Sequence, residues 1–183
     1  STMKEFDSSF RRIFLVILQL FDRTIEAVER NEIKDVNLCK ELHTMDLNVD
    51  RLVDYCGRIL NKNAYTFSES KKMLLWSILF QLELIGDEFK YVGKHLAVSK
   101  KPIKDVLSLI QNSKEYFDMY YKFFYNFDRQ QAVKLGKSDV DVYTQHFKEK
   151  EKLQGESRSI ARHISDINKM ILCLSELRIQ MEF

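Results

Sequence analysis

Residues 75–96 read LWSILFQLELIGDEFKYVGKHL, and this stretch decides which fold the chain adopts. Apolar side chains recur at every third or fourth position, which is the period of an amphipathic α-helix. Beside the apolar stripe stand two carboxylates four residues apart, Glu83 and Asp87, with Gly86 between them. The segment therefore predicts a buried helix with an acidic pair at the edge of its buried face. The stripe consists of Leu75, Ile78, Leu79, Leu82, Ile85, Phe89 and Val92.

The composition of the whole chain favours helices throughout. The 183 residues include 1 proline and 5 glycines, whereas an all-β chain needs many of both for its turns. Apolar residues make up 45% of the chain and charged residues 31%, which is enough for one sizeable core or two small ones. We therefore expect an all-α fold.

The apolar periodicity divides the chain into six helical segments separated by short polar breaks. Ser68 stands where it could cap the third segment, after a polar turn at 61–66. The stretch SKKPI at 99–103 holds the only proline, so we interpret it as a connector between two domains. This predicts two tandem antiparallel three-helix bundles, at residues 1–98 and 104–183. The expected helices span residues 8–30, 33–60, 71–98, 104–127, 129–152 and 156–181.

Charge, apolar runs and cysteine usage exclude several classes of protein. The 29 basic and 27 acidic side chains give a net charge of +2, without the basic excess of a nucleic-acid-binding domain. No apolar run reaches the roughly 20 residues of a membrane span. The three cysteines have no CxxC spacing, which indicates core residues of a cytoplasmic protein. The chain contains no phosphate-binding glycine motif, no GxSxG and no Glu-x-x-His, so we expect no enzyme activity.

A second acidic pair, Asp46 and Asp50, lies beside the apolar stripe of the preceding helix. If the two pairs face each other on neighbouring antiparallel helices, four anions share one place and a hard multivalent cation would relieve their repulsion. Gly86 would let a neighbouring group approach closely. His43, one turn before Asp46, could add a nitrogen ligand. Solvated acidic faces are common on helices, however, and from spacing alone that interpretation is the stronger one.

The two acidic elements also resemble a family signature. Residues 83–87, ELIGD, resemble the ERIGD signature of the PhoU family of phosphate-uptake regulators, with Leu84 at the arginine position. Residues 46–50, DLNVD, resemble the family's E(D)xxxD element on the preceding helix. The resemblance covers most of the chain, extends to archaeal members, and is strongest for residues 33–97. It implies the same plan of tandem three-helix bundles.

The resemblance implies a non-enzymatic regulator of phosphate transport and phosphate signalling that contacts a phosphate transporter or a sensor kinase. The second bundle departs from the family pattern, because Arg162 stands at the glutamate position and Lys137 and Asp141 replace the acidic pair. Since cationic side chains repel a metal ion, we expect at most one metal centre, in the first bundle. Its ion would be divalent or trivalent (Fe, Zn, Mn, Mg or Ca, among which the sequence does not choose). The implied ligands are Asp46, Asp50, Glu83 and Asp87.

The aromatic run at 116–127, YFDMYYKFFYNF, allows two interpretations. Its rings either pack inside the protein or a homodimer, or they form an exposed surface for a partner. Rings on successive faces of one helix need several neighbours, which favours the first interpretation, and we expect a homodimer. The alternative to a metal-binding regulator is a metal-free helical module for interaction or dimerisation.

Overall fold

Six α-helices and one short 3₁₀ turn form the protein in a computed structural model that describes residues 2–63 and 66–183. No strand occurs among those residues, and the all-α prediction is confirmed. Residues 64 and 65, in the turn predicted at 61–66, lie outside the described part. Within the two described ranges, none of the helices combines the length and the low polarity that crossing a membrane requires. The elements are α1 (Thr2–Glu29), α2 (Val36–Lys62), α3 (Glu69–Val98), η1 (Lys104–Val106), α4 (Leu107–Tyr125), α5 (Arg129–Lys150) and α6 (Gly155–Gln180).

The first helix is longer than predicted and the third is capped as predicted. α1 begins at Thr2, six residues before the predicted start at Ser8. The extension is stabilised by Phe6, which is only 3% exposed and stacks on Phe10. At α3, the hydroxyl of Ser68 accepts a hydrogen bond of 3.2 Å from the backbone amide three residues later, so the predicted N-cap is confirmed.

The second helix begins three residues later than predicted, at Val36 instead of Ile33. Asn31 and Lys34 both have positive φ angles, so the chain cannot be helical through this turn. Asp35 then caps α2, because its carboxylate accepts hydrogen bonds from two backbone amides of the first turn. The cap, and not the apolar stripe, therefore determines where α2 begins.

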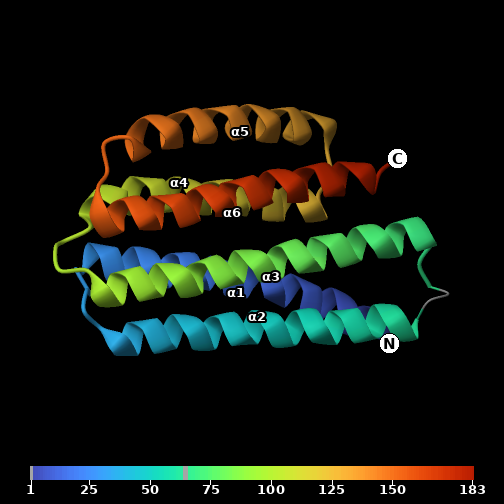
Figure 1. The fold of residues 1–183 in the computed structure, drawn as a ribbon. Coiled ribbons are helices and arrows are strands. Elements are labelled where there is room, and N and C mark those ends of the chain that lie inside the picture. The colour runs from blue at the N-terminus through green and yellow to red at the C-terminus, as the bar shows by residue number, and fades with distance from the viewer. Residues whose placement is uncertain (1, 64–65) are drawn as a thin grey trace.

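The helices form two three-helix bundles that lie side by side (Figure 1). α1, α2 and α3 form the first bundle, and α4, α5 and α6 form the second. The bundles meet where α1 packs against α4 and α3 packs against α6, while α2 and α5 lie on the outer sides. A single buried core includes side chains from both bundles. The architecture agrees with the prediction, and the domain boundary at 99–103 stays a prediction.

Aromatic rings fill the joint between α1 and α4. Phe14 on α1 is fully buried. None of the eight rings in the run at 116–127 is exposed, so this run packs inside the protein, and the predicted homodimer stays a prediction. The ring centroid of Phe14 lies 5.1–5.9 Å from those of Phe10, Phe117, Tyr120, Tyr121, Phe124 and Tyr125.

The outer helix α5 buries few of its side chains. Only Leu135 and His146 are buried in it. The helix instead exposes four large apolar side chains that recur along its length, and such exposed groups are typical of a protein contact site. They are Val133, Val140, Tyr143 and Phe147.

Candidate metal centre

Close contact between α2 and α3 brings the two acidic elements together. Glycines at three levels of the pair allow the helices to approach: Gly57 lies against Trp76, Gly86 against Asp46, and Gly93 against Leu42. These contacts show that the two helices run antiparallel, as Figure 1 also shows. The antiparallel register places residues 46–50 of α2 beside residues 83–87 of α3.

Three of the four predicted ligands form one cluster. Asp46, Asp50 and Asp87 each offer a carboxylate oxygen, and the three oxygens lie within 4.8 Å of one another. Asp46 is 1% exposed, and neither of its oxygens has a hydrogen-bond partner. One oxygen of Asp50 is also buried without a partner. Buried acceptors are almost always satisfied in folded proteins, so these orphaned oxygens indicate a need for a cation or donor.

The cluster makes ionisation of Asp46 unfavourable. Burial, together with the nearby carboxylates of Asp50 and Asp87, raises the pKa of Asp46 to about 7. Burial is also the main cause that raises the pKa values of Asp50 and Glu83. A bound cation would act in the opposite direction, because it stabilises the ionised form of every carboxylate around it.

Glu83 and His43 lie outside the three-carboxylate cluster. Glu83 is half-buried on α3 and feels the charges of Asp50 and Asp87, but its carboxylate is not among the oxygens within 4.8 Å. The side chain of His43 is exposed on α2 and is likewise absent from the cluster. Glu83 therefore stays a predicted ligand that would have to move toward an ion, and the nitrogen ligand considered for His43 gains no support.

Sequence reasoning missed Lys90, whose ammonium group lies beside the acidic cluster. Lys90 lies one turn after Asp87 on α3, and its Nζ atom is 3.0 Å from Asp87 Oδ1 and 3.9 Å from Asp46 Oδ2. The spacing of three residues between Asp87 and Lys90 is the signal that could have revealed this pair. Lys90 partly neutralises the pocket, so an ion and this ammonium group compete for the same carboxylates.

Gly86 provides the space that Asp46 occupies. A Cβ atom at position 86 would lie 2.7 Å from Asp46 Oδ1 and 3.5 Å from the side chain of Val49. Any residue larger than glycine would therefore displace the buried carboxylate. The glycine beside the acidic pair thus has a packing reason, which is the close approach of a carboxylate from the neighbouring helix.

Gly86→Ala is expected to destabilise the protein by about 1 kcal/mol. The added methyl group overpacks the contact, which costs about 1–3 kcal/mol, whereas the higher helix propensity of alanine stabilises α3 by up to about 1 kcal/mol. Gly136→Ala on α5 is the matched control, because nothing lies within 4 Å of its added Cβ atom. We expect the control to gain about 0.5–1 kcal/mol. Urea denaturation measures both variants, and an equal gain in the two would contradict the tight contact at Gly86.

The donor set fits a hard cation. The described cluster offers only carboxylate oxygens, two of them on a fully buried side chain without partners. Oxygen-only sets of this kind suit Mg²⁺, Mn²⁺, Ca²⁺ and Fe³⁺ better than ions that prefer nitrogen or sulfur. One lysine does not balance three carboxylates, so the pocket keeps a negative charge that would attract such an ion.

The corresponding part of the second bundle has a different character. Lys137, Asp141 and Arg162 are exposed, and none belongs to a metal-ligand cluster among the described residues.

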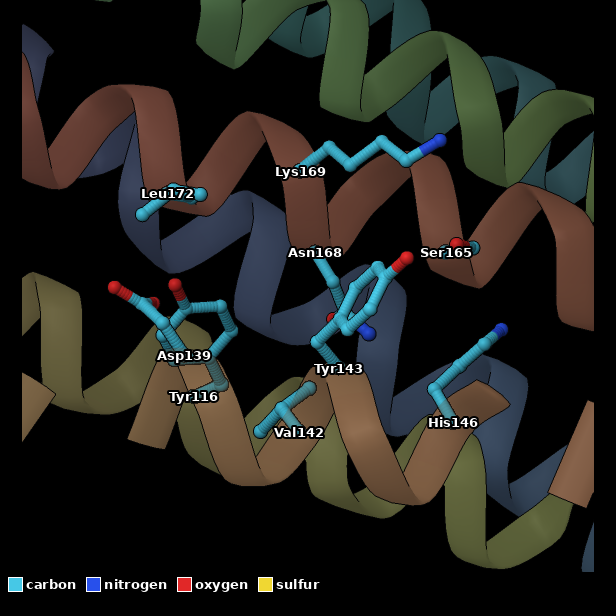
Figure 2. A pocket seen from close by; sticks show the side chains of 9 residues that line it. All are labelled: Tyr116, Asp139, Val142, Tyr143, His146, Ser165, Asn168, Lys169 and Leu172. Carbon is cyan, nitrogen blue, oxygen red and sulfur yellow. The ribbon is translucent and has the colours of Figure 1, made fainter. Parts of the chain in front are cut away.

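Between α4, α5 and α6 lies a cavity of about 50 Å³, with Asp139 and His146 at opposite ends (Figure 2). Burial raises the pKa of Asp139 to about 6 and lowers that of His146. The cavity has the volume of one or two water molecules, so it does not accommodate an organic ligand.

Comparison with solved structures identifies a protein of the same fold. The structure is similar to the crystal structure of the phosphate transport system regulatory protein PhoU from Streptococcus pneumoniae, with a TM-score of 0.80 and 12% sequence identity. The similarity covers 98% of this chain and 94% of that one. The chain therefore has a PhoU-like fold, as the resemblance in its sequence predicts. No protein-family model matches the sequence, and no curated protein matches it.

Proposed function

We propose that the chain is a PhoU-like regulator that modulates phosphate transport and phosphate signalling through protein contacts and has no catalytic activity. The observation that carries this proposal is the extent of the fold similarity, which includes nearly the whole length of both chains. The six helices thus match the solved PhoU structure over 98% of this chain and 94% of that one, and this match supports a regulatory role.

The proposal includes a metal centre at Asp46, Asp50, Glu83 and Asp87. The orphaned oxygens of Asp46 support it, because a cation would provide the partner that they lack. A bound ion would supply positive charge that holds α2 and α3 together at this level. Asp46 and Asp50 would hold it from α2, Glu83 and Asp87 from α3, and Lys90 would move toward solvent.

The proposed partners are a phosphate transporter or a sensor kinase, contacted in the cytoplasm, and a second copy of the chain. The four exposed apolar side chains of α5 support a protein contact, since large exposed apolar groups on one helix are typical of interfaces. The balanced charge of the chain, +2 in 183 residues, favours a protein partner over nucleic acid.

The metal centre is tested by elemental analysis and Mn²⁺ titration of the purified protein. Asp50→Asn combined with Glu83→Gln is expected to remove one equivalent of Mn²⁺ or to weaken its binding at least about 10-fold, since each substitution deletes an anionic ligand. Asp141→Asn combined with Glu151→Gln is the matched control, because both side chains are exposed outside the pocket. Equal Mn²⁺ binding by the two double variants would disprove this metal centre.

The regulatory role is tested in the native host by deleting the gene and measuring uptake of radiolabelled phosphate. Deletion should change the uptake rate or its response to external phosphate, and the wild-type gene should restore it. Affinity purification of the full-length protein should enrich a phosphate transporter subunit or a sensor kinase. Unchanged uptake and the absence of both kinds of partner would disprove the regulatory role, whatever the metal content.

A metal-free interaction module is the second candidate function. The contact of 3.0 Å between Lys90 and Asp87 favours it, because a lysine already offsets part of the charge that an ion would neutralise. In this case the wild-type protein binds no Mn²⁺, and the double variant at Asp50 and Glu83 keeps its protein partner.

A further inference from the structure

A second group of metal-ligand side chains lies between the two bundles, on α3 and α6. Glu88 of α3 and His163 and Asp166 of α6 each offer one ligand atom, and the three atoms lie within 4.8 Å of one another. His163 Nδ1 is 2.6 Å from Glu88 Oε2. The sequence analysis expected no metal centre outside the first bundle, and it did not connect these residues because Glu88 is 75 or more positions away from His163 and Asp166.

The surroundings hold the imidazole of His163 in place. Its ring stacks on Tyr91, with ring centroids 5.5 Å apart and planes 20° apart. The ring centroid of His95, one turn after Tyr91 on α3, lies 5.3 Å from that of His163. His95 is itself hydrogen-bonded to Glu156 of α6 at 2.5 Å. An imidazole that is oriented in advance loses little entropy when it binds an ion.

Asp166 is available as a ligand and leaves the group open to solvent. The side chains of Glu88 and His163 are 14% and 15% exposed, whereas that of Asp166 is 41% exposed. Its contact with Lys169 is a loose surface ion pair of 3.8 Å, which contributes little and is easily broken. An ion can therefore reach the two less exposed ligands from the side of Asp166.

We propose that Glu88, His163 and Asp166 bind a borderline divalent cation such as Zn²⁺, which connects the first bundle to the second. One imidazole nitrogen with two carboxylate oxygens suits Zn²⁺ and Co²⁺, and water completes the coordination. The first-bundle pocket differs in chemistry, because it offers oxygens alone and connects α2 to α3. This inference does not depend on the proposed regulatory function.

The alternative for these residues is a hydrogen bond between bundles without an ion. Glu88 and His163 already form a hydrogen bond, with His163 Nδ1 2.6 Å from Glu88 Oε2. An ion must replace the shared proton. It must also separate these two atoms to roughly 3.3 Å, because metal–ligand bonds are near 2.1 Å long. Asp166 distinguishes the two cases, because the hydrogen bond does not use it and the ion does.

The test is a titration of chelator-treated full-length protein with Co²⁺, followed by visible absorption, and with Zn²⁺ in competition. The Asp50→Asn, Glu83→Gln double variant serves as the starting protein, so that the first-bundle pocket does not contribute. It should bind one equivalent of Zn²⁺, and Zn²⁺ should shift the imidazole signals of His163 in NMR spectra. At 100 times the dissociation constant, Zn²⁺ should raise the unfolding midpoint by roughly 5–10 °C.

Adding Asp166→Asn or His163→Gln to this protein should weaken Zn²⁺ binding at least about 10-fold. Asp141→Asn and His43→Gln are the matched controls, since both side chains are exposed outside the group, and they should leave the affinity unchanged. The half-exposed position of Asp166 means that its substitution should preserve the fold, which circular dichroism verifies. Failure to bind Zn²⁺, or binding that Asp166→Asn and His163→Gln leave unaltered, would overturn the inference.

Discussion

Asp46→Asn is expected to stabilise the metal-free protein by about 2 kcal/mol at pH 8, and to weaken Mn²⁺ binding in the first bundle at the same time. The folded protein keeps Asp46 protonated up to about pH 7, against an ordinary pKa of 3.8. Between these values the unfolded chain binds fewer protons than the folded one, so stability falls as the pH rises from about 4 to about 7.

The loss of stability that comes from ionising the buried Asp46 is fully present above about pH 7 and is absent below about pH 4. A shift of about three pKa units corresponds to at most about 4 kcal/mol. The substitution gains only part of this free energy, because the amide of asparagine is also buried without a hydrogen-bond partner, and that costs about 1–3 kcal/mol.

Urea denaturation in the presence of a chelator, at pH 5 and pH 8, measures the effect. The wild-type protein should lose more stability between the two pH values than Asp46→Asn does. Some pH dependence should persist in the variant, because burial also raises the pKa values of Asp50, Glu83 and Asp139. Asp141→Asn should follow the wild-type profile, and parallel profiles for wild type and Asp46→Asn would show that Asp46 is not a strained buried carboxylate.

Phe14→Ala is expected to have the largest destabilising effect, with a loss of about 4 kcal/mol in the free energy of unfolding. Phe14 is fully buried where α1 meets α4, so its removal leaves a cavity between the two bundles. Each of the surrounding ring contacts adds to the loss, because close aromatic pairs contribute beyond the area that they bury.

Leu15→Ala is the matched control, since Leu15 follows Phe14 in the sequence and is 44% exposed. It should change the unfolding free energy by less than about 1 kcal/mol. Urea denaturation monitored by circular dichroism measures both variants. A similar small effect for the two would contradict the position of Phe14 at the centre of the joint between bundles.

The helices and the acidic pocket could be predicted because both depend on local periodicity. Apolar residues at helical spacing identify all six helices, and residues four apart on one helix necessarily share a face. The meeting of Asp46 with Asp87 required only that α2 and α3 be antiparallel neighbours, which a short connection favours. The start of α2 was less predictable, because it depends on the cap at Asp35.

The details that the sequence did not predict depend on contacts between distant segments or on side-chain direction. Lys90 has the right spacing for a pair with Asp87, but lysines on helices usually point into solvent, and its reach toward Asp46 depends on the packing of α2. The contact of Glu88 with His163 depends on how the two bundles dock, and no local pattern encodes that register. These side chains differ from other lysines, glutamates and histidines of the chain by their position in the fold, which the sequence pattern does not encode.

Asp87 and Glu88 are consecutive residues of α3, yet Asp87 belongs to a group with α2 and Glu88 to a group with α6. A rotation of α3 about its axis, or a slide along it, therefore displaces both carboxylates in one movement. A single peptide unit therefore separates the contact with the second bundle from the acidic pocket. If binding on one side of α3 moves the helix, it alters the free energy of binding on the other side, and thermodynamic linkage makes that influence equal in both directions.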